Sequence, residues 1–226
     1  MNDNAHEEPR DEALDPAEML RLLNDQQKSV ESQFSSIAWK VSAIWGIAWT
    51  IGFGAVWLVD GLKPAFSIPK TSGYIVLGVV VSIAVVVSVV SGVRSGRGVR
   101  TTKADAFVAA AYGSTWPLTM IGFWLFGMAL LSQGMSDTTT EFYFSSGFVL
   151  MTGFMMAVSA AVWKMKSALA VGVWLVIIAA VAPFFGTPGN YLFLAMSGGL
   201  VFIGFAVAIA AYNAGLKRRV TGGNHG

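Results

Sequence analysis

Few side chains in the apolar segments of this 226-residue chain could do acid–base, nucleophilic or metal chemistry. Buried acids and histidines are the usual groups of proton and ion pathways in membranes. Here Asp60 and Asp105 lie at the ends of apolar segments, and the two histidines are His6 and His225. The chain has no cysteine, which excludes disulfides, thiolate nucleophiles and zinc–sulfur sites. We therefore predict no enzyme activity, no catalytic residue, no cofactor and no metal site.

One polar group does stand within an apolar segment. It consists of Tyr112, Thr115, Trp116 and Pro117. A proline inside a helix removes a backbone hydrogen bond and kinks the helix, and broken helices can line transport cavities. We expect either a cavity or a packing kink at this point.

The composition explains why reactive groups are scarce. Hydrophobic residues make up 54% of the chain and charged residues 12%, whereas soluble domains carry roughly 25% charged residues. The first 35 residues hold nine acids and three bases, and the remainder holds four acids and twelve bases. The near-neutral total thus hides an acidic head on a basic body.

Uninterrupted runs without charge measure how often the chain could cross a bilayer. They are 41–59, 71–93, 106–136, 142–163 and 167–216. A helix needs about twenty apolar residues to span the hydrocarbon, and the fifth run is long enough for two helices. It is broken by two prolines and two glycines between Pro183 and Asn190. We predict an all-α, polytopic membrane protein whose six helices occupy 37–216, at about 38–60, 72–94, 107–132, 143–163, 167–185 and 190–214.

Lysine and arginine in the short loops predict the orientation. Bases gather in the second loop, the fourth loop and the tail at 217–226, namely Arg94, Arg97, Arg100, Lys103, Lys164, Lys166, Lys217, Arg218 and Arg219. The third and fifth loops have none, and Lys63 and Lys70 in the first loop are the exception. We expect the chain to lie in a plasma or inner membrane, with both termini in the cytoplasm. The second-loop bases fix topology or, alternatively, dock anionic lipid or a cytosolic partner.

A helix start precedes the first span. Asp15 can cap the helix, Pro16 suits its first position, and Glu18 can reach back to the cap. Apolar residues then recur at helical spacing, so we interpret 15–36 as a cytoplasmic amphipathic helix. It either packs on the membrane or bundle, or docks a cytoplasmic partner. We expect the acidic tail at 1–14 to be disordered.

Small residues recur at every fourth position in the first span. They are Ser42, Gly46, Thr50 and Gly54, and the fourth span has a similar series in Gly153, Ala157 and Ala161. In lipid, helices associate by close backbone approach, which small residues allow. We expect another helix to lie against each series, and Trp45 and Trp49 to point elsewhere. The alternative is an interface in a homodimer or with another membrane subunit.

Four stretches carry a resemblance to a known group of proteins. They are WGIAWTIGFG at 45–54, SGRGVR at 95–100, YGSTWPL at 112–118 and APFFGTPGNYLFLAMSGG at 182–199. They resemble a group of uncharacterised bacterial six-helix integral membrane proteins, over roughly residues 20–214. Members are loosely labelled transporters or permease-like. The resemblance implies no catalytic or binding residue.

The expected architecture is also similar to that of ABC-2-type exporter permeases. Those have cytoplasmic termini, an amphipathic helix before the first span and an inner loop that meets an ATPase, places taken here by 15–36 and 94–105. The likeness implies a permease-like component of an export system that relies on a separate cytosolic ATPase. The alternative is a non-transporting assembly or regulatory protein. The lipid bilayer is the expected surrounding, and no nucleic-acid partner is expected.

Overall fold

The computed structural model describes residues 15–96 and 102–222, and in those ranges the regular elements are helices, with no strand. Five long helices come first, namely α1 (Pro16–Trp57), α2 (Lys70–Gly96), α3 (Lys103–Ser132), α4 (Asp137–Trp163) and α5 (Lys166–Val181). A 3₁₀ turn, η1 (Ala182–Phe185), extends α5. After a short turn, α6 (Gly189–Leu194), the π-helical segment η2 (Ala195–Leu200) and α7 (Val201–Gly222) follow without a break.

The first helix joins two elements that the sequence suggested separately. α1 begins at Pro16, where the carbonyl oxygen of Asp15 accepts hydrogen bonds from the N–H groups of Glu18 and Met19 at 2.8 and 2.9 Å. It continues through the expected first span and ends at Trp57, three residues before the expected end at 60. The side chains of 22–38 lie outside the described part of the chain, so the amphipathic character of 15–36 stays a prediction.

Two helices begin earlier than the charge-free runs indicated. α3 begins at Lys103 rather than at 107, because the Thr102 hydroxyl caps it by accepting from the N–H of Asp105 at 3.2 Å. α4 begins at Asp137 rather than at 143, and Ser136 caps it through the N–H of Thr139 at 3.3 Å. Polar first turns stabilise helix starts, and a search for runs without charge leaves them out.

The break predicted between Pro183 and Asn190 is a sharp turn between η1 and α6. Its residue Gly186 has φ +63°, a backbone conformation that favours glycine. The N–H of Asn190 donates back to the carbonyl of Gly186 at 2.8 Å, which starts α6 at once. The chain therefore reverses within a few residues and returns along α1.

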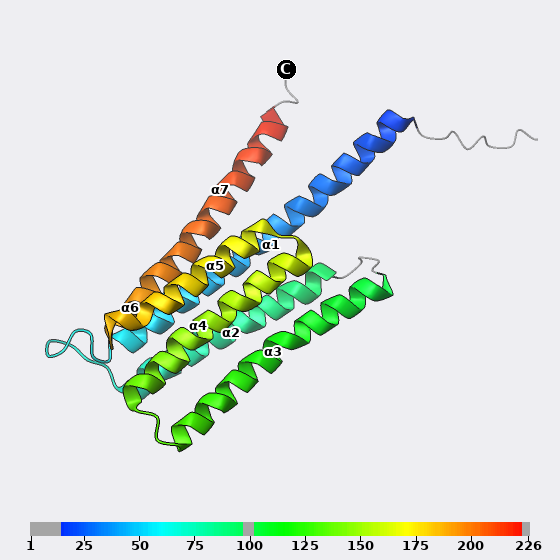
Figure 1. Ribbon diagram of the computed structural model, residues 1–226. Helices are drawn as coiled ribbons and strands as arrows, with labels where there is room; N and C mark the ends of the chain where they lie inside the picture. Colours follow the sequence, from blue (N-terminus) through cyan, green and yellow to red (C-terminus); the bar gives the residue numbers. More distant parts are fainter. Residues whose placement is uncertain (1–14, 97–101, 223–226) are drawn as a thin grey trace, which may run out of the picture.

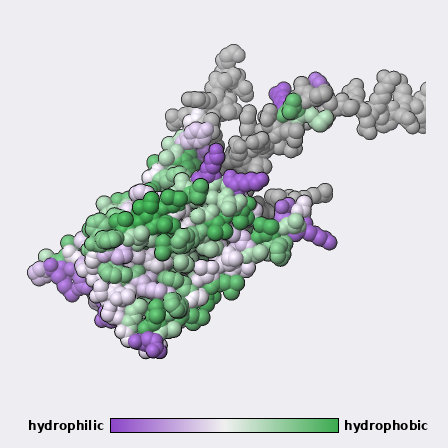
Figure 2. All heavy atoms as spheres, in the orientation of Figure 1, coloured by the Kyte–Doolittle hydropathy of each residue, from purple (hydrophilic) through white to green (hydrophobic). Residues whose placement is uncertain are grey.

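Five helices in the described residues are long and apolar enough to cross a membrane. They are Lys70–Arg94, Lys103–Ser132, Asp137–Trp163, Lys166–Phe185 and Gly189–Gly215. Figure 2 shows hydrophobic side chains over the middle of the visible face and hydrophilic side chains at its two ends. This is the character of a membrane-spanning protein. The expected first span lies in α1 and is not one of these five helices.

The helices form a bundle in which α1 lies between α2 and the α6–α7 helix, while α4 packs on α5 (Figure 1). α3 packs mainly along α4, at the side of the bundle. The start of α1 and the end of α7 lie at one end of the bundle, together with the end of α2 and the start of α3. We call the opposite end, where α1, α3 and η1 end, the distal end.

One core holds these elements together near the distal end. α1, α4, α5, η1, α6 and η2 each contribute buried side chains to it, namely Trp49, Phe53, Val56, Val149, Leu175, Ile178, Ala179, Ala182, Tyr191, Leu194 and Ala195. Because the core fixes the distances between α1, α4 and α6, it also fixes the positions of the side chains that these helices carry between the core and the distal end.

Candidate functional site

The small residues of α1 lie partly against the π-helical segment. A Cβ atom on Gly46 would be 2.9 Å from the carbonyl oxygen of Gly199, and a Cβ on Gly199 would be 2.7 Å from the amide nitrogen of Thr50. A Cβ on Gly54 would meet no atom within 4 Å, and Ser42 is half-buried. Of the four residues, Gly46 and Thr50 therefore form the close approach.

The two tryptophans of this stretch differ in direction. The indole N–H of Trp45 donates to the hydroxyl of Ser88 on α2 at 3.0 Å, away from the glycines. Trp49 is only 5% exposed, covers Gly198 and meets Phe202 edge-on at 5.6 Å between ring centroids. The expectation that Trp49 points away was wrong, because two adjacent glycines in η2 leave space for its ring.

The series in the fourth span lies against α5. A Cβ on Gly172 would be 2.8 Å from the carbonyl oxygen of Gly153 and 2.7 Å from the amide nitrogen of Ala157. Ala161, the last member of the series, is exposed. Gly172 is the partner that the sequence reasoning did not name, because only Ala168 lies four positions before it and Val176, four positions after it, ends the series.

The polar group of α3 joins that helix to α4. The Tyr112 hydroxyl donates to the carbonyl oxygen of Met155 at 3.1 Å and also hydrogen-bonds the hydroxyl of Ser159. α3 stays helical through the proline. The remaining members of the group are exposed or half-buried on the same helix: Thr115, Trp116 and Pro117. The pocket described below is lined by none of these residues.

The basic second loop is described only at its edges. Arg94, near the end of α2, and Lys103, the first residue of α3, are both exposed. Arg97 and Arg100 lie outside the residues that the structure describes. Whether these four bases fix topology or dock a partner stays a prediction.

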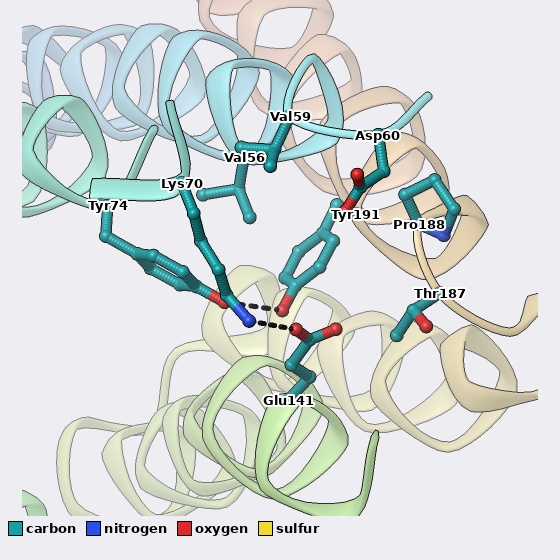
Figure 3. Close-up of a pocket in the computed structure, with 9 residues that line it drawn as sticks. All are labelled: Val56, Val59, Asp60, Lys70, Tyr74, Glu141, Thr187, Pro188 and Tyr191. Carbon is teal, nitrogen blue, oxygen red and sulfur yellow. Dashed lines mark hydrogen bonds and ion pairs between the residues drawn. The ribbon is translucent and has the colours of Figure 1, made fainter. Parts of the chain in front are cut away.

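A pocket of about 180 Å³ lies at the distal end, where α1, α2, α4 and α6 meet (Figure 3). Three ionisable groups, two tyrosines, two valines and the turn before α6 line it, namely Asp60, Lys70, Glu141, Tyr74, Tyr191, Val56, Val59, Thr187 and Pro188. A pocket lined by a few convergent polar groups is the usual place of a binding site. This pocket is the candidate site.

Two side-chain pairs cross the pocket. The Lys70 ammonium on α2 contacts Oε1 of Glu141 on α4 at 3.0 Å. The hydroxyls of Tyr74 on α2 and Tyr191 on α6 point toward each other and are 3.2 Å apart (Figure 3). The Glu141 side chain is 19% exposed and that of Lys70 59% exposed, so the carboxylate belongs to the wall and the ammonium to the mouth.

Behind the pocket, the buried side-chain amide of Asn190 joins α6 to α4. Asn190, which is 0% exposed, donates from Nδ2 to the Ser145 hydroxyl at 3.1 Å. Ser145 in turn donates to the carbonyl oxygen of Glu141 at 2.6 Å. The Oδ1 atom of Asn190 has no hydrogen-bond partner in the described part of the chain. This network ties α6 to α4 and so positions Tyr191 and Glu141, which face the pocket.

The end of α1 and the first residues of the loop that follows it form a further side of the pocket, with Val56, Val59 and Asp60. Asp60 follows the last turn of the helix and pairs with Lys63 in the loop, where both side chains are exposed. The Ser67 hydroxyl donates to the carbonyl oxygen of Val59 at 2.9 Å. That bond holds the loop against the end of α1, and Lys70 begins α2 three residues later. The loop thus delivers one acid and one base to the same pocket.

Chemically, the pocket offers two carboxylates, one ammonium and two phenols. Such groups can bind a small polar solute, and the pocket pairs no nucleophile with a base. The sequence reasoning did not single out these residues as a site. Two signals pointed toward it: Lys70 departs from the pattern of the basic loops, and the break before α6 ends at Asn190.

No protein-family model, no curated protein and no solved structure matches this chain.

Proposed function

We propose that this chain is a permease-like membrane subunit that crosses the membrane six times and receives a small polar solute in its distal-end pocket. The observation that carries the proposal is the pocket itself. Within a bundle whose surface is apolar, Lys70, Glu141, Tyr74 and Tyr191 come from three helices to one cavity. A few polar and ionisable side chains that converge on one pocket support a role in contacting solute.

The sixth span in this proposal is the second half of α1. Residues 41–59 carry no charge, and α1 lies between α2 and α7 in the bundle. An even number of crossings agrees with the start of α1 and the end of α7 lying at the same end of the bundle (Figure 1). With that end in the cytoplasm, as the basic loops predict, the pocket opens on the outer side.

The absence of cysteine makes the topology directly testable. Single cysteines at the exposed positions Glu18, Ala65, Thr138 and Ser167 can be reacted with a membrane-impermeant maleimide. We expect Ala65→Cys and Thr138→Cys to be labelled in intact cells. Glu18→Cys and Ser167→Cys should react only after permeabilisation. Labelling of Glu18→Cys and Ala65→Cys from the same side would contradict a sixth span in α1.

The transport part of the proposal is tested by purification from native membranes. A permease that relies on a separate ATPase should carry that ATPase with it, and charge reversal at the exposed Arg94 and Lys103 should release it. The matched control is charge reversal at Lys63, which is exposed at the distal end. A wild-type chain that brings only another integral membrane protein would favour the alternative, a non-transporting assembly or regulatory protein.

A further inference from the structure

We infer that the distal-end pocket takes a small organic cation of the alkylammonium class, and that the Lys70 ammonium occupies the cation position when no solute is bound. The inference rests on the proposed function for the role of the pocket as a solute site. It adds the charge and the size of the solute, and it identifies Lys70 as a competitor within the chain.

The lining charges favour a cation. Asp60 pairs with Lys63, and both side chains are more than half exposed, so this pair adds no net charge to the pocket. Glu141 is the least exposed charge in the lining, and Lys70 is its counterion. A free ammonium that replaces Lys70 at this carboxylate keeps its charge neutralised, whereas an anion there would add a second negative charge.

The Lys70–Glu141 pair shows where the cation would lie. Glu141 stands within the second turn of α4, and only Oε1 of its carboxylate contacts Lys70. Lys70, by contrast, is the first residue of α2 and its flexible side chain is mostly exposed. A lysine ammonium can move into solvent on its four-carbon stem. The carboxylate thus stays in place while the tethered ammonium yields to a free one.

The tyrosines and the volume set the rest of the specificity. The hydroxyl oxygens of Tyr74 and Tyr191 can accept hydrogen bonds from an ammonium group, and their rings favour a nearby cation. Val56 and Val59 supply an apolar side for an alkyl group. A cavity of about 180 Å³ is slightly larger than one of roughly 150 Å³ that holds benzene, so ligands of about five to eight heavy atoms fit.

The first test uses three probes of similar size and different charge: n-butylammonium, butyramide and butyrate. Each is titrated against the full chain in phosphatidylcholine nanodiscs, whose zwitterionic lipid carries no net charge, with empty nanodiscs as the blank. We expect saturable binding of butylammonium, detected by calorimetry, and none of butyrate. Butyrate binding as tight as butylammonium, or no saturable butylammonium binding, would overturn the inference. This arm needs no variant to fold.

The second test uses variants whose effects have opposite signs. Glu141→Gln should weaken butylammonium binding by about tenfold or more, since a charge-assisted hydrogen bond is lost. Lys70→Met should strengthen it several-fold, because the internal competitor is gone. Asp105→Asn and Lys166→Met remove the same charges from exposed positions outside the pocket and should change nothing. Weaker butylammonium binding by Lys70→Met would refute the competitor.

The two proposals fail separately. If butylammonium binds with this pattern and native membranes yield no ATPase, the permease role fails and the cation site stands. If an ATPase copurifies and butylammonium does not bind, the permease role stands and the cation site is wrong.

Discussion

Replacing Gly172 by alanine tests the contact between α4 and α5 with a single methyl group. The ideal Cβ would be 2.7 Å from the amide nitrogen of Ala157, 2.8 Å from the carbonyl oxygen of Gly153 and 3.2 Å from the Cα of Ala157. All three neighbours are backbone atoms, so no side chain can rotate to make room. The helices must move apart instead.

The size of the effect follows from these distances. Ordinary van der Waals contact begins at 3.4 Å, so the closest distance is short by about 0.7 Å. Overpacking a well-packed interior costs about 1–3 kcal/mol, and rigid neighbours favour the upper value. The exchange of glycine for alanine within a helix returns about 1 kcal/mol. The net loss in the free energy of unfolding should therefore be about 2 kcal/mol, roughly a 30-fold change in the folded-to-unfolded ratio.

The assay is SDS titration of the purified protein in mixed micelles, followed by tryptophan fluorescence. The matched control is Gly122→Ala on α3, where the added Cβ would meet no atom within 4 Å. The control should gain up to about 1 kcal/mol from helix propensity. Equal stabilities for Gly172→Ala and Gly122→Ala would refute the packing argument, because propensity alone would then account for both.

Two further predictions concern hydrogen bonds. Ser145→Ala should cost about 1–3 kcal/mol because it leaves Nδ2 of the buried Asn190 without its partner. Ser146→Ala should be neutral or stabilising, since the Ser146 hydroxyl is buried without a hydrogen-bond partner in the described residues; the reverse order in SDS titration would argue against this network. Tyr112→Phe should cost about 1 kcal/mol and speed amide exchange in α3, because it removes the hydroxyl that joins α3 to α4. Tyr212→Phe, at a position that is 68% exposed, should leave that exchange rate unchanged.

Charge-free runs located the helices because charge is what a bilayer excludes, but they could not locate the helix starts. Lys103 and Asp137 are charged and still belong to the first turns of α3 and α4, since capping by Thr102 and Ser136 depends on local hydrogen bonds. Small residues at every fourth position indicated close approach, and Gly46 takes part in one. The spacing could not show that Gly54 meets no neighbouring atom, because that depends on how the helices cross.

The candidate site could not be predicted from the sequence because its residues meet only after the helices pair. Lys70 and Glu141 are 71 residues apart, and Tyr74 and Tyr191 are 117 residues apart. Each stands near a helix end, where a polar residue is unremarkable. Only the joint position of α2, α4 and α6 brings an acid, a base and two phenols to one cavity.

The contact of Gly46 with Gly199 also orders events during synthesis. α1 is made early and α6 and η2 late, so Gly46 and Trp49 lack their contact with η2, and Phe53 lacks its contact with Tyr191, while the intervening helices are made. A nascent chain that stops before Gly189 would present those aromatic rings to lipid or to a chaperone. The contact between α1 and η2 can thus form only after η2 has been made, and a quality-control system that inspects this surface could tell a finished molecule from an interrupted one.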